Sequence, residues 1–257
     1  MAVVDRNVVL EALSALTGST VKPYSGNKGF GYADELNILN FIANALLQES
    51  LRSTNATSRA QASSLTASFS TALRNELFVD MDEFFDPQYD CDFTNCTDNS
   101  VCWRGNEAYK RPCGWYRVAL KVVNKYPDGN TWLGPDGWRS HSVDGEWPVS
   151  YHGTTIEGAK GIVRSHYTAG SGQQYGRGIY STYDLSQASG YSREFTSKTN
   201  GKRYRVIMQN RINPKMRKVC KRQDYWLIEV PAGTSPAKEK EIVEKSIRPY
   251  GILLKQV

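Results

Sequence analysis

The chain has 257 residues and a formal net charge of +6 at pH 7, with 40% hydrophobic and 23% charged residues. This composition is ordinary for a globular protein and allows one large domain or two small ones. No stretch approaches about 20 consecutive apolar residues, and the first residues lack the basic and apolar segments of a secretory signal. We therefore expect an intracellular protein that does not enter a membrane.

Residues 1–78 show the apolar spacing of helices. Asp5 is a suitable N-cap for a first helix, which is predicted to stop near Gly18. Apolar residues at steps of three and four predict a second helix over 33–51 and a third over 65–77. Since no catalytic group of residues is visible here, we expect a helical N-terminal region packed on the rest of the chain.

Residues 79–113 are acidic and aromatic without a clear period, which predicts an irregular connector. Its aspartates are expected to lie on a solvated face rather than to bind a metal. Four of the five cysteines are close together here, but none are spaced as Cys-x-x-Cys, and the total is odd. This pattern favours free thiols over a zinc site or a complete disulfide framework. The four are Cys91, Cys96, Cys102 and Cys113.

From Gly114 onward the signals are those of strands. Residues 116–122, 204–208 and 250–254 show the alternation of strands, and 225–230 is a further predicted strand. Three tryptophans between these segments are expected in the core or as surface anchors rather than at a ligand: Trp132, Trp138 and Trp147. Several strands with few helices between them predict an α+β fold with a mostly antiparallel sheet.

The chemistry is concentrated in three segments, YHGTT, YGRGIYST and DLSQASGY, between residues 151 and 191. His152 and Gly153 end a short apolar segment, and a glycine-rich turn then leads Tyr180 into an extended one. A helical pattern follows and is predicted to place Tyr191 about three turns beyond Tyr180. Glycine lets a backbone approach a ligand closely, and two tyrosines can enclose a flat aromatic group. This combination is typical of a nucleotide pocket.

This ordered set resembles the signature of the poly(ADP-ribose) polymerase-type ADP-ribosyltransferases, where HGS, GKGIYFA and a Ser-x-x-Tyr helix follow one another. Residues 204–207 resemble the next strand of that family, 223–228 its Asn-Glu-Tyr-Ile-Val-Tyr segment, and 247–255 its final strand. The resemblance spans about 147–255. It implies a PARP-like ADP-ribosyltransferase domain over 114–257, with a split, mostly antiparallel two-sheet core.

The resemblance also implies a reaction and roles for residues. NAD would be the co-substrate, and ADP-ribose would pass to a macromolecular acceptor with release of nicotinamide, through a transition state like an oxocarbenium ion. His152 would hydrogen-bond the ribose on the adenine side, and the Gly153 main chain would hold the carboxamide. Tyr180 and Tyr191 would lie on opposite faces of the nicotinamide ring.

Neighbouring residues would complete this pocket. Thr154 would place a hydroxyl near the adenosine, and Gly178 belongs to the turn that shapes the site. Arg177 is either solvated or in contact with the pyrophosphate. Ala188 stands where the family has a serine that bonds the carboxamide, so a nearby hydroxyl such as that of Ser189 would have to replace that contact.

The acidic group is a second departure from the family. Polymerising members carry Glu before the Tyr of the fourth segment, whereas this chain has Asp224 before Tyr225. We expect Asp224 to be the catalytic acid, with Glu229 as its rival. Because its side chain is one methylene shorter, we expect mono- rather than poly-modified products.

The partner and the role of the first residues remain open at this stage. Residues 202–222 carry nine basic residues and no acid, which leaves a protein acceptor, a nucleic acid, or an ordinary solvated loop as alternatives. A binding module for NAD or ADP-ribose without catalysis is the main alternative function, and a related transferase acting on nucleic acid is the other. Residues 1–78 would either stabilise the core by packing or shield the NAD site.

Overall fold

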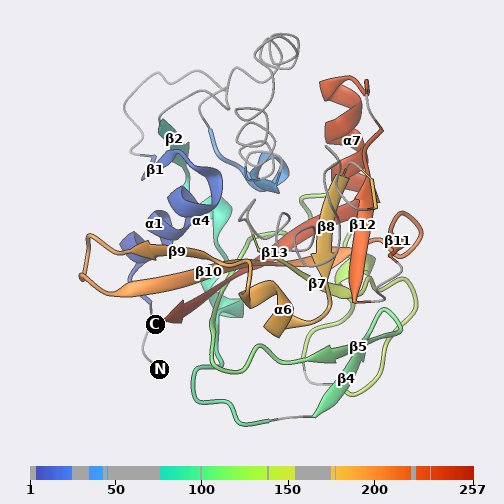
Figure 1. Ribbon diagram of the computed structural model, residues 1–257, viewed down its shortest axis with the longest axis horizontal. Coiled ribbons are helices and arrows are strands. Elements are labelled where there is room, and N and C mark those ends of the chain that lie inside the picture. The colour runs from blue at the N-terminus through green and yellow to red at the C-terminus, as the bar shows by residue number, and fades with distance from the viewer. Residues whose placement is uncertain are drawn as a thin grey trace, which may run out of the picture.

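Figure 1 shows the computed structural model of the chain. It describes residues 4–24, 35–42, 45, 76–98, 100–137, 139–153, 175–176, 178–220, 224–231 and 233–257. The helices of these residues are α1 (Arg6–Thr17), α4 (Met81–Phe84), α6 (Leu185–Ser189) and α7 (Pro236–Ser246), with short 3-10 helices η3 (Pro87–Tyr89) and η4 (Thr131–Leu133). The strands are β1 (Thr20–Pro23), β2 (Glu76–Val79), β3 (Cys91–Asp92), β4 (Val101–Arg104), β5 (Glu107–Lys110), β6 (Tyr116–Ala119), β7 (Val149–His152), β8 (Gly178–Thr182), β9 (Arg193–Thr196), β10 (Arg203–Ile212), β11 (Lys218–Val219), β12 (Tyr225–Glu229) and β13 (Ile247–Gln256).

One large sheet organises the molecule. In the described part of the chain it has nine strands, in the order β11-β12-β8-β7-β10-β13-β6-β3, with β9 paired to β10. Every pair in it is antiparallel. The long strands β10 and β13 cross the middle of the molecule (Figure 1). The predicted α+β class with a mostly antiparallel sheet is therefore confirmed.

Helix α1 forms where the sequence predicts it. The Asp5 carboxylate accepts a hydrogen bond from the main-chain nitrogen of Asn7 at 2.8 Å, which satisfies an N–H that the helix itself leaves without a partner. Gly18 ends the helix in the left-handed conformation with φ 69°, which glycine adopts without steric penalty. The apolar side of α1 shares one buried cluster with β6, β10 and β13 through Val9, Leu13, Leu16, Val118, Met208 and Ile252.

The rest of the N-terminal region is not wholly helical. Residues 38–42 and 45 are helical as predicted, but 20–23 and 76–79 form a small parallel sheet, β1–β2. The predicted helix over 65–77 is therefore wrong at its end. Leu77 belongs to strand β2, where its side chain points to the buried side. The predicted boundary at residue 78 lies inside β2. The remainder of the third predicted helix lies outside the described residues.

The prediction of an irregular connector over 79–113 is wrong for much of its length. Strand β3 joins the edge of the large sheet by pairing with β6. Strands β4 and β5 form a hairpin with Cys102 opposite Tyr109, and the lower part of Figure 1 shows this hairpin beside the large sheet. Each of the two strands has only four residues, which is too short to give a clear alternation.

Helix α7 was missed from the sequence although its start carries a signal. Ser235 stands at the N-cap position and a proline follows at the first helical position, where its missing N–H is not needed. Ion pairs at helical spacing then join Lys238 and Lys245 to Glu241. No helix within the described ranges is long and apolar enough to cross a membrane.

Candidate functional site

One side of the paired strands β8 and β12 is rich in tyrosine. The strands run antiparallel with Tyr180 opposite Leu227, and successive side chains of a strand alternate between the two sides of a sheet. Tyr180 and Leu227 therefore share a side with Tyr225. With the side chains packed against them they form what we call the tyrosine face: Tyr175, Tyr180, Tyr191, Cys220, Tyr225 and Leu227.

The opposite side of the same two strands is apolar and closed. Ile179, Trp226 and Ile228 alternate onto this side, and Val243 of helix α7 packs against them. We call this buried set the isoleucine face; its members are Ile42, Ile179, Ile212, Trp226, Ile228, Val243 and Ile247. Any ligand contact made by β8 and β12 therefore has to come from the tyrosine face.

His152 is buried at the end of β7 and bonds the neighbouring strand. Its Nδ1 lies 2.6 Å from the main-chain oxygen of Tyr180. A carbonyl oxygen only accepts, so Nδ1 carries the proton, and in the neutral ring Nε2 is the acceptor nitrogen. The ring thus bonds the Tyr180 main chain and fixes the end of β7 to β8.

Gly153 and Tyr191 lie directly against each other. A Cβ atom built on Gly153 would lie 2.5 Å from the Tyr191 carbonyl oxygen and 2.7 Å from the Tyr191 Cβ. No side chain fits in this space, so the sequence requires glycine at position 153. This contact brings Gly153 and the chain just after helix α6 together. Tyr191, however, follows a helix of only five residues rather than three turns of helix.

The Tyr180 side chain is held by its hydroxyl group. This hydroxyl donates to the Gly176 carbonyl at 2.7 Å and accepts from the Tyr175 nitrogen at 3.1 Å. Partial burial raises the pKa of Tyr180 to about 12, so the phenol is neutral at physiological pH. The fixed phenol leaves the aromatic ring, rather than the oxygen, to contact a ligand.

The Asp224 carboxylate is bonded by a side chain of helix α6. The Gln187 side-chain amide donates a hydrogen bond to Asp224 Oδ2. Asp224 directly precedes Tyr225, whose hydroxyl lies 3.2 Å from the Tyr191 hydroxyl. Sequence reasoning missed Gln187. The signal for it is indirect: Asp184 caps α6 by accepting from the Ser186 nitrogen, which fixes the rotation of the helix.

The remaining predicted site residues are distributed differently. Thr154 and Arg177 lie outside the described residues. Ser189 ends α6, where its carbonyl accepts from the Ser192 hydroxyl at 2.8 Å, and Ala188 is buried. A Cβ atom on Gly178 would overlap the Ile228 carbonyl oxygen. That glycine is therefore needed for the close approach of β12.

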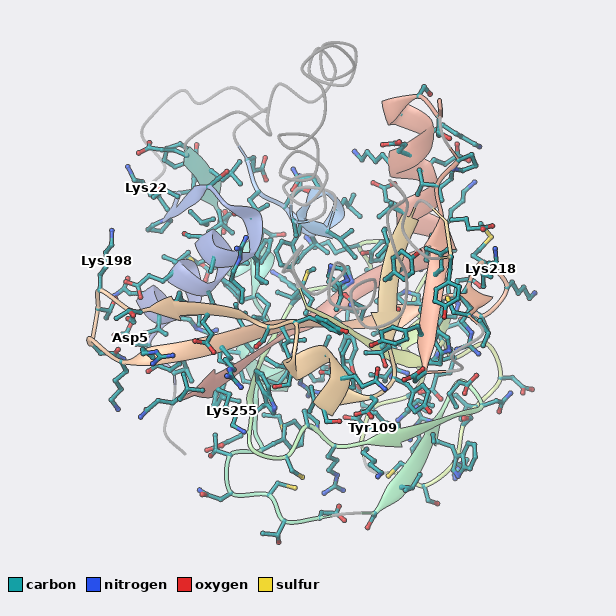
Figure 2. The ribbon with its side chains drawn as sticks, in the orientation of Figure 1. Asp5, Lys22, Tyr109, Lys198, Lys218 and Lys255 are labelled. Atoms are coloured by element: carbon teal, nitrogen blue, oxygen red, sulfur yellow. The ribbon has the colours of Figure 1, made fainter. Side chains whose placement is uncertain are left out.

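Glu229, the rival acid, is at the other end of β12 from Asp224. It pairs with Gly178 across the sheet, and its exposed carboxylate forms an ion pair with Lys218 at 2.7 Å. Figure 2 shows Lys218 at the outer edge of the sheet, on β11. By the alternation of β12, Glu229 lies on the same side of the sheet as Tyr225 and Leu227. Its carboxylate, however, is exposed and paired with Lys218, whereas Asp224 is bonded by Gln187 of helix α6.

Distant acids neutralise much of the basic segment 202–222. Arg203 and Arg205 share Glu194 at 2.8 Å, and Lys218 is paired with Glu229. Arg217 bonds Glu107 of the β4–β5 hairpin, and its guanidinium lies 4.0 Å from the centre of the Trp226 ring. These basic side chains form ion pairs within the protein. Less unpaired positive charge therefore remains to bind the phosphates of a nucleic acid.

Arg211 of the same segment belongs to a buried ion cluster. It donates to Glu146 Oε1 at 3.0 Å and to the Trp147 carbonyl at 2.6 Å. Arg139 also bonds Glu146, and Arg104 lies 3.7 Å from it. Burial alone would raise the pKa of Glu146, but the arginines outweigh it and hold the pKa below its usual range. The cluster holds Glu146 and Trp147, which directly precede β7, against β10.

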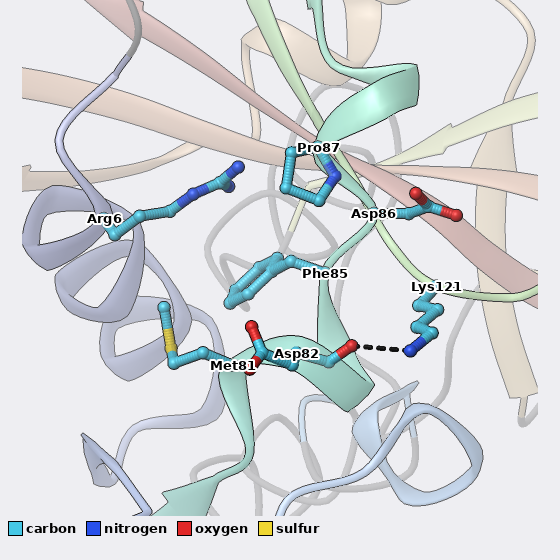
Figure 3. A pocket seen from close by; sticks show the side chains of 7 residues that line it. All are labelled: Arg6, Met81, Asp82, Phe85, Asp86, Pro87 and Lys121. Atoms are coloured by element: carbon cyan, nitrogen blue, oxygen red, sulfur yellow. Dashed lines mark hydrogen bonds between the residues drawn. The ribbon is translucent and has the colours of Figure 1, made fainter.

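A separate pocket of about 310 Å³ lies far from these residues in the fold, between α1 and the α4–η3 segment (Figure 3). Its walls are Arg6, Met81, Asp82, Phe85, Asp86, Pro87 and Lys121. The Lys121 ammonium donates to the Asp82 carbonyl at 2.8 Å, and Arg6 pairs with Asp90 at 2.9 Å. Its two cations are thus used within the protein, and we assign it no ligand.

A metal site finds no support in the described residues, where no three His, Cys, Asp or Glu side chains come together. A scan against models of protein families and a search of curated proteins find no match to this chain.

Proposed function

We propose that this chain is an NAD-dependent mono-ADP-ribosyltransferase with a PARP-like fold, in which the two sheets expected from the resemblance are joined into one, within the described residues, through the single residue pair of β7 with β8. The observation that carries the proposal is the contact of three separated segments at the tyrosine face. Gly153 packs on Tyr191, which follows helix α6, and Gln187 of that helix bonds Asp224. Strands β12, β8 and β7, which bear the Asp-Tyr, Gly-Ile-Tyr and His-Gly segments, are direct neighbours in the sheet.

The residues fit NAD in their chemical types. The Gly153 N–H and C=O are main-chain groups of the kind that hold a carboxamide, and the rings of Tyr180 and Tyr191 offer apolar surfaces for a flat heterocycle. When bound, NAD supplies a glycosidic bond to nicotinamide that breaks with development of positive charge. The Asp224 carboxylate would stabilise this charge and bind a ribose hydroxyl, while His152 holds the end of β7 in place.

A binding module for NAD or ADP-ribose is the second candidate function. It is favoured by one observation: the Asp224 carboxylate is already bonded by the Gln187 amide, and its side chain is shorter than glutamate. A carboxylate fixed in this way can still bind a ribose hydroxyl. It can nevertheless lie too far from the reacting carbon of NAD to support catalysis. Displacement of about 1 Å costs roughly 100-fold in rate.

The acceptor is proposed to be a protein. The ion pairs of Arg203, Arg205, Arg211, Arg217 and Lys218 with acids of this chain reduce the charge available for phosphates. Products are proposed to carry single ADP-ribose units, because Asp224 is shorter than the glutamate used in polymer growth.

The test is an assay of nicotinamide release from NAD, with protein and RNA offered as acceptors in parallel. Wild type should release nicotinamide above buffer, and Asp224→Asn should reduce the rate by roughly 100-fold or more while the protein stays folded. Glu229→Gln is the matched control and should retain activity. Unchanged activity in Asp224→Asn would contradict the proposed acid. NAD binding without release by wild type would favour the binding module.

A further inference from the structure

Two cysteine-bearing segments are held together below the large sheet. The Phe93 nitrogen donates to the Trp115 carbonyl at 3.0 Å, and the Gly114 nitrogen donates to the Phe93 carbonyl at 2.8 Å. An ion pair of 2.9 Å between Arg111 and Asp98 joins the same two segments. The segment that follows the β4–β5 hairpin therefore lies against the segment that precedes it.

Cys96 and Cys113 meet at this point. Their Sγ atoms are 2.6 Å apart and both residues are half-buried, so small solutes can reach them. This separation is only about half an ångström beyond the ~2.05 Å of a covalent S–S bond. The main-chain bonds beside them fix this proximity, so that no rearrangement of the fold is needed to bring the sulfurs together.

The segment that these cysteines enclose supports the strands of the candidate site. The Tyr151 hydroxyl of β7, directly before His152, donates to the Lys110 carbonyl at 3.3 Å. Glu107 at the start of β5 bonds Arg217, whose guanidinium packs on Trp226 of β12. Holding the ends of the segment 96–113 together thus limits how far the hairpin can move from β7 and β12.

The two thiols differ in reactivity. A hydrogen bond from Cys113 and one from the Asp98 backbone lower the pKa of Cys96. Burial, followed by the neighbouring Cys96, raises the pKa of Cys113 to about 11. Since the thiolate is the nucleophile, Cys96 is the thiol that attacks first.

We infer that Cys96 and Cys113 are a disulfide-forming pair that locks the β4–β5 hairpin against the sheet. The oxidant is a small-molecule disulfide such as glutathione disulfide. The Cys96 thiolate attacks one sulfur and releases one glutathione. The Cys113 thiolate then attacks the Cys96 sulfur of the mixed disulfide and releases the second. Two protein thiols lose two electrons and two protons, and one glutathione disulfide becomes two glutathiones.

The test compares full-length protein incubated with glutathione disulfide and with reduced glutathione. Free thiols are alkylated in denaturant, and the protein is digested with trypsin and an enzyme that cleaves before aspartate. Cleavage before Asp92 and Asp98 isolates Cys96 from the other cysteines, and tryptic peptide 111–117 carries Cys113. The linked pair of peptides should dominate after oxidation. The melting temperature should rise by roughly 5–10 °C over the reduced protein, since the bond closes a loop of 17 residues.

Variants separate this pair from the other thiols. Cys96→Ser and Cys113→Ser should each lose the linked peptides and the oxidant-dependent rise in melting temperature, while melting like the reduced wild type. Cys91→Ser, only five positions away, should behave as wild type. Recovery of Cys96 and Cys113 as alkylated peptides after oxidation would overturn the inference, as would a link from Cys96 to another cysteine. The experiment uses no NAD, so its outcome is independent of the proposed function.

Discussion

The two sides of strands β8 and β12 differ although they alternate along the same ten residues. On the isoleucine face, Ile179, Trp226 and Ile228 are almost completely buried and pack against α7. On the tyrosine face, Tyr180 and Tyr191 are half-buried and their hydroxyls are hydrogen-bonded. Leu227 and Tyr225 of the tyrosine face are buried as well, so both sides contribute to the core, and only the tyrosine face also carries half-buried aromatic rings with hydrogen-bonded hydroxyls.

The two faces are expected to contribute differently to stability and to ligand binding. Complete burial of one large apolar side chain contributes about 1.5–3 kcal/mol, which the isoleucine face gains several times over. On the tyrosine face Leu227 and Tyr225 gain similarly, whereas the half-buried Tyr180 and Tyr191 gain less and are held, like Asp224, by hydrogen bonds. Substitutions on the first face should therefore lower stability, and substitutions on the second should lower ligand binding or turnover.

The largest effect is expected from Trp226→Ala on the isoleucine face. It removes a fully buried ring and the surface on which Arg217 packs, which should cost about 3–5 kcal/mol of unfolding free energy. Urea denaturation measures this loss. Tyr225→Phe, the adjacent residue on the tyrosine face, is the control and should cost about 1 kcal/mol or less. Equal losses would remove the distinction between the faces.

A second prediction concerns the contact of Gly153 with Tyr191. In Gly153→Ala the new methyl group would overlap the Tyr191 main chain, so the end of α6 must move, at a cost of about 1–3 kcal/mol. Binding of an NAD analogue should weaken along with stability. Gly190→Ala is the matched control, because its Cβ would meet only the Gln187 carbonyl, at 3.3 Å, and binding should be nearly unchanged.

A smaller effect is expected from Gln187→Ala. Losing the amide that bonds Asp224 should change stability by about 1 kcal/mol but reduce turnover roughly tenfold, equivalent to about 1.4 kcal/mol of activation energy. Steady-state kinetics should show the loss in kcat more than in KM, because the amide positions the carboxylate. Ser186→Ala, on the same helix and exposed, should leave kcat intact. An unchanged kcat in Gln187→Ala would show that the contact has no catalytic role.

The smallest effect is on alkaline stability. An unfolded tyrosine ionises near pH 10, whereas Tyr180 in the folded protein keeps its proton up to about pH 12. Above pH 10 the folded state therefore binds more protons than the unfolded state, so its stability falls as the pH rises from 10 to 12. Urea titrations at these pH values should show a shallower fall in Tyr180→Phe than in wild type. Identical slopes would contradict the raised pKa.

Local patterns predicted the elements on which these faces are built. Alternation over 250–254, the predicted strand over 225–230 and the Gly-Ile-Tyr segment correspond to strands β13, β12 and β8, and Asp5 gave the start of α1. These signals are local, because burial of one side imposes a period of two or 3.6 on the sequence itself.

Contacts between distant segments could not be predicted in this way. Gln187 and Asp224 are 37 residues apart, and their contact depends on how α6 lies on the sheet. Likewise the basic segment 202–222 gives no sign that its partners are Glu107, Glu146 and Glu194. The β4–β5 hairpin is too short for its alternation to stand out, although its ends carry Cys96 and Cys113.

The most direct test of the central claim is calorimetric titration of a non-hydrolysable NAD analogue into wild type, Tyr191→Ala and Val243→Ala. All three are first shown to be folded at the working temperature. Wild type should bind saturably, Tyr191→Ala should bind roughly tenfold more weakly because a stacking surface is lost, and Val243→Ala on the isoleucine face should bind like wild type despite its lower stability. Absence of binding to wild type, or an equal loss in both variants, would contradict the assignment of the ligand to the tyrosine face.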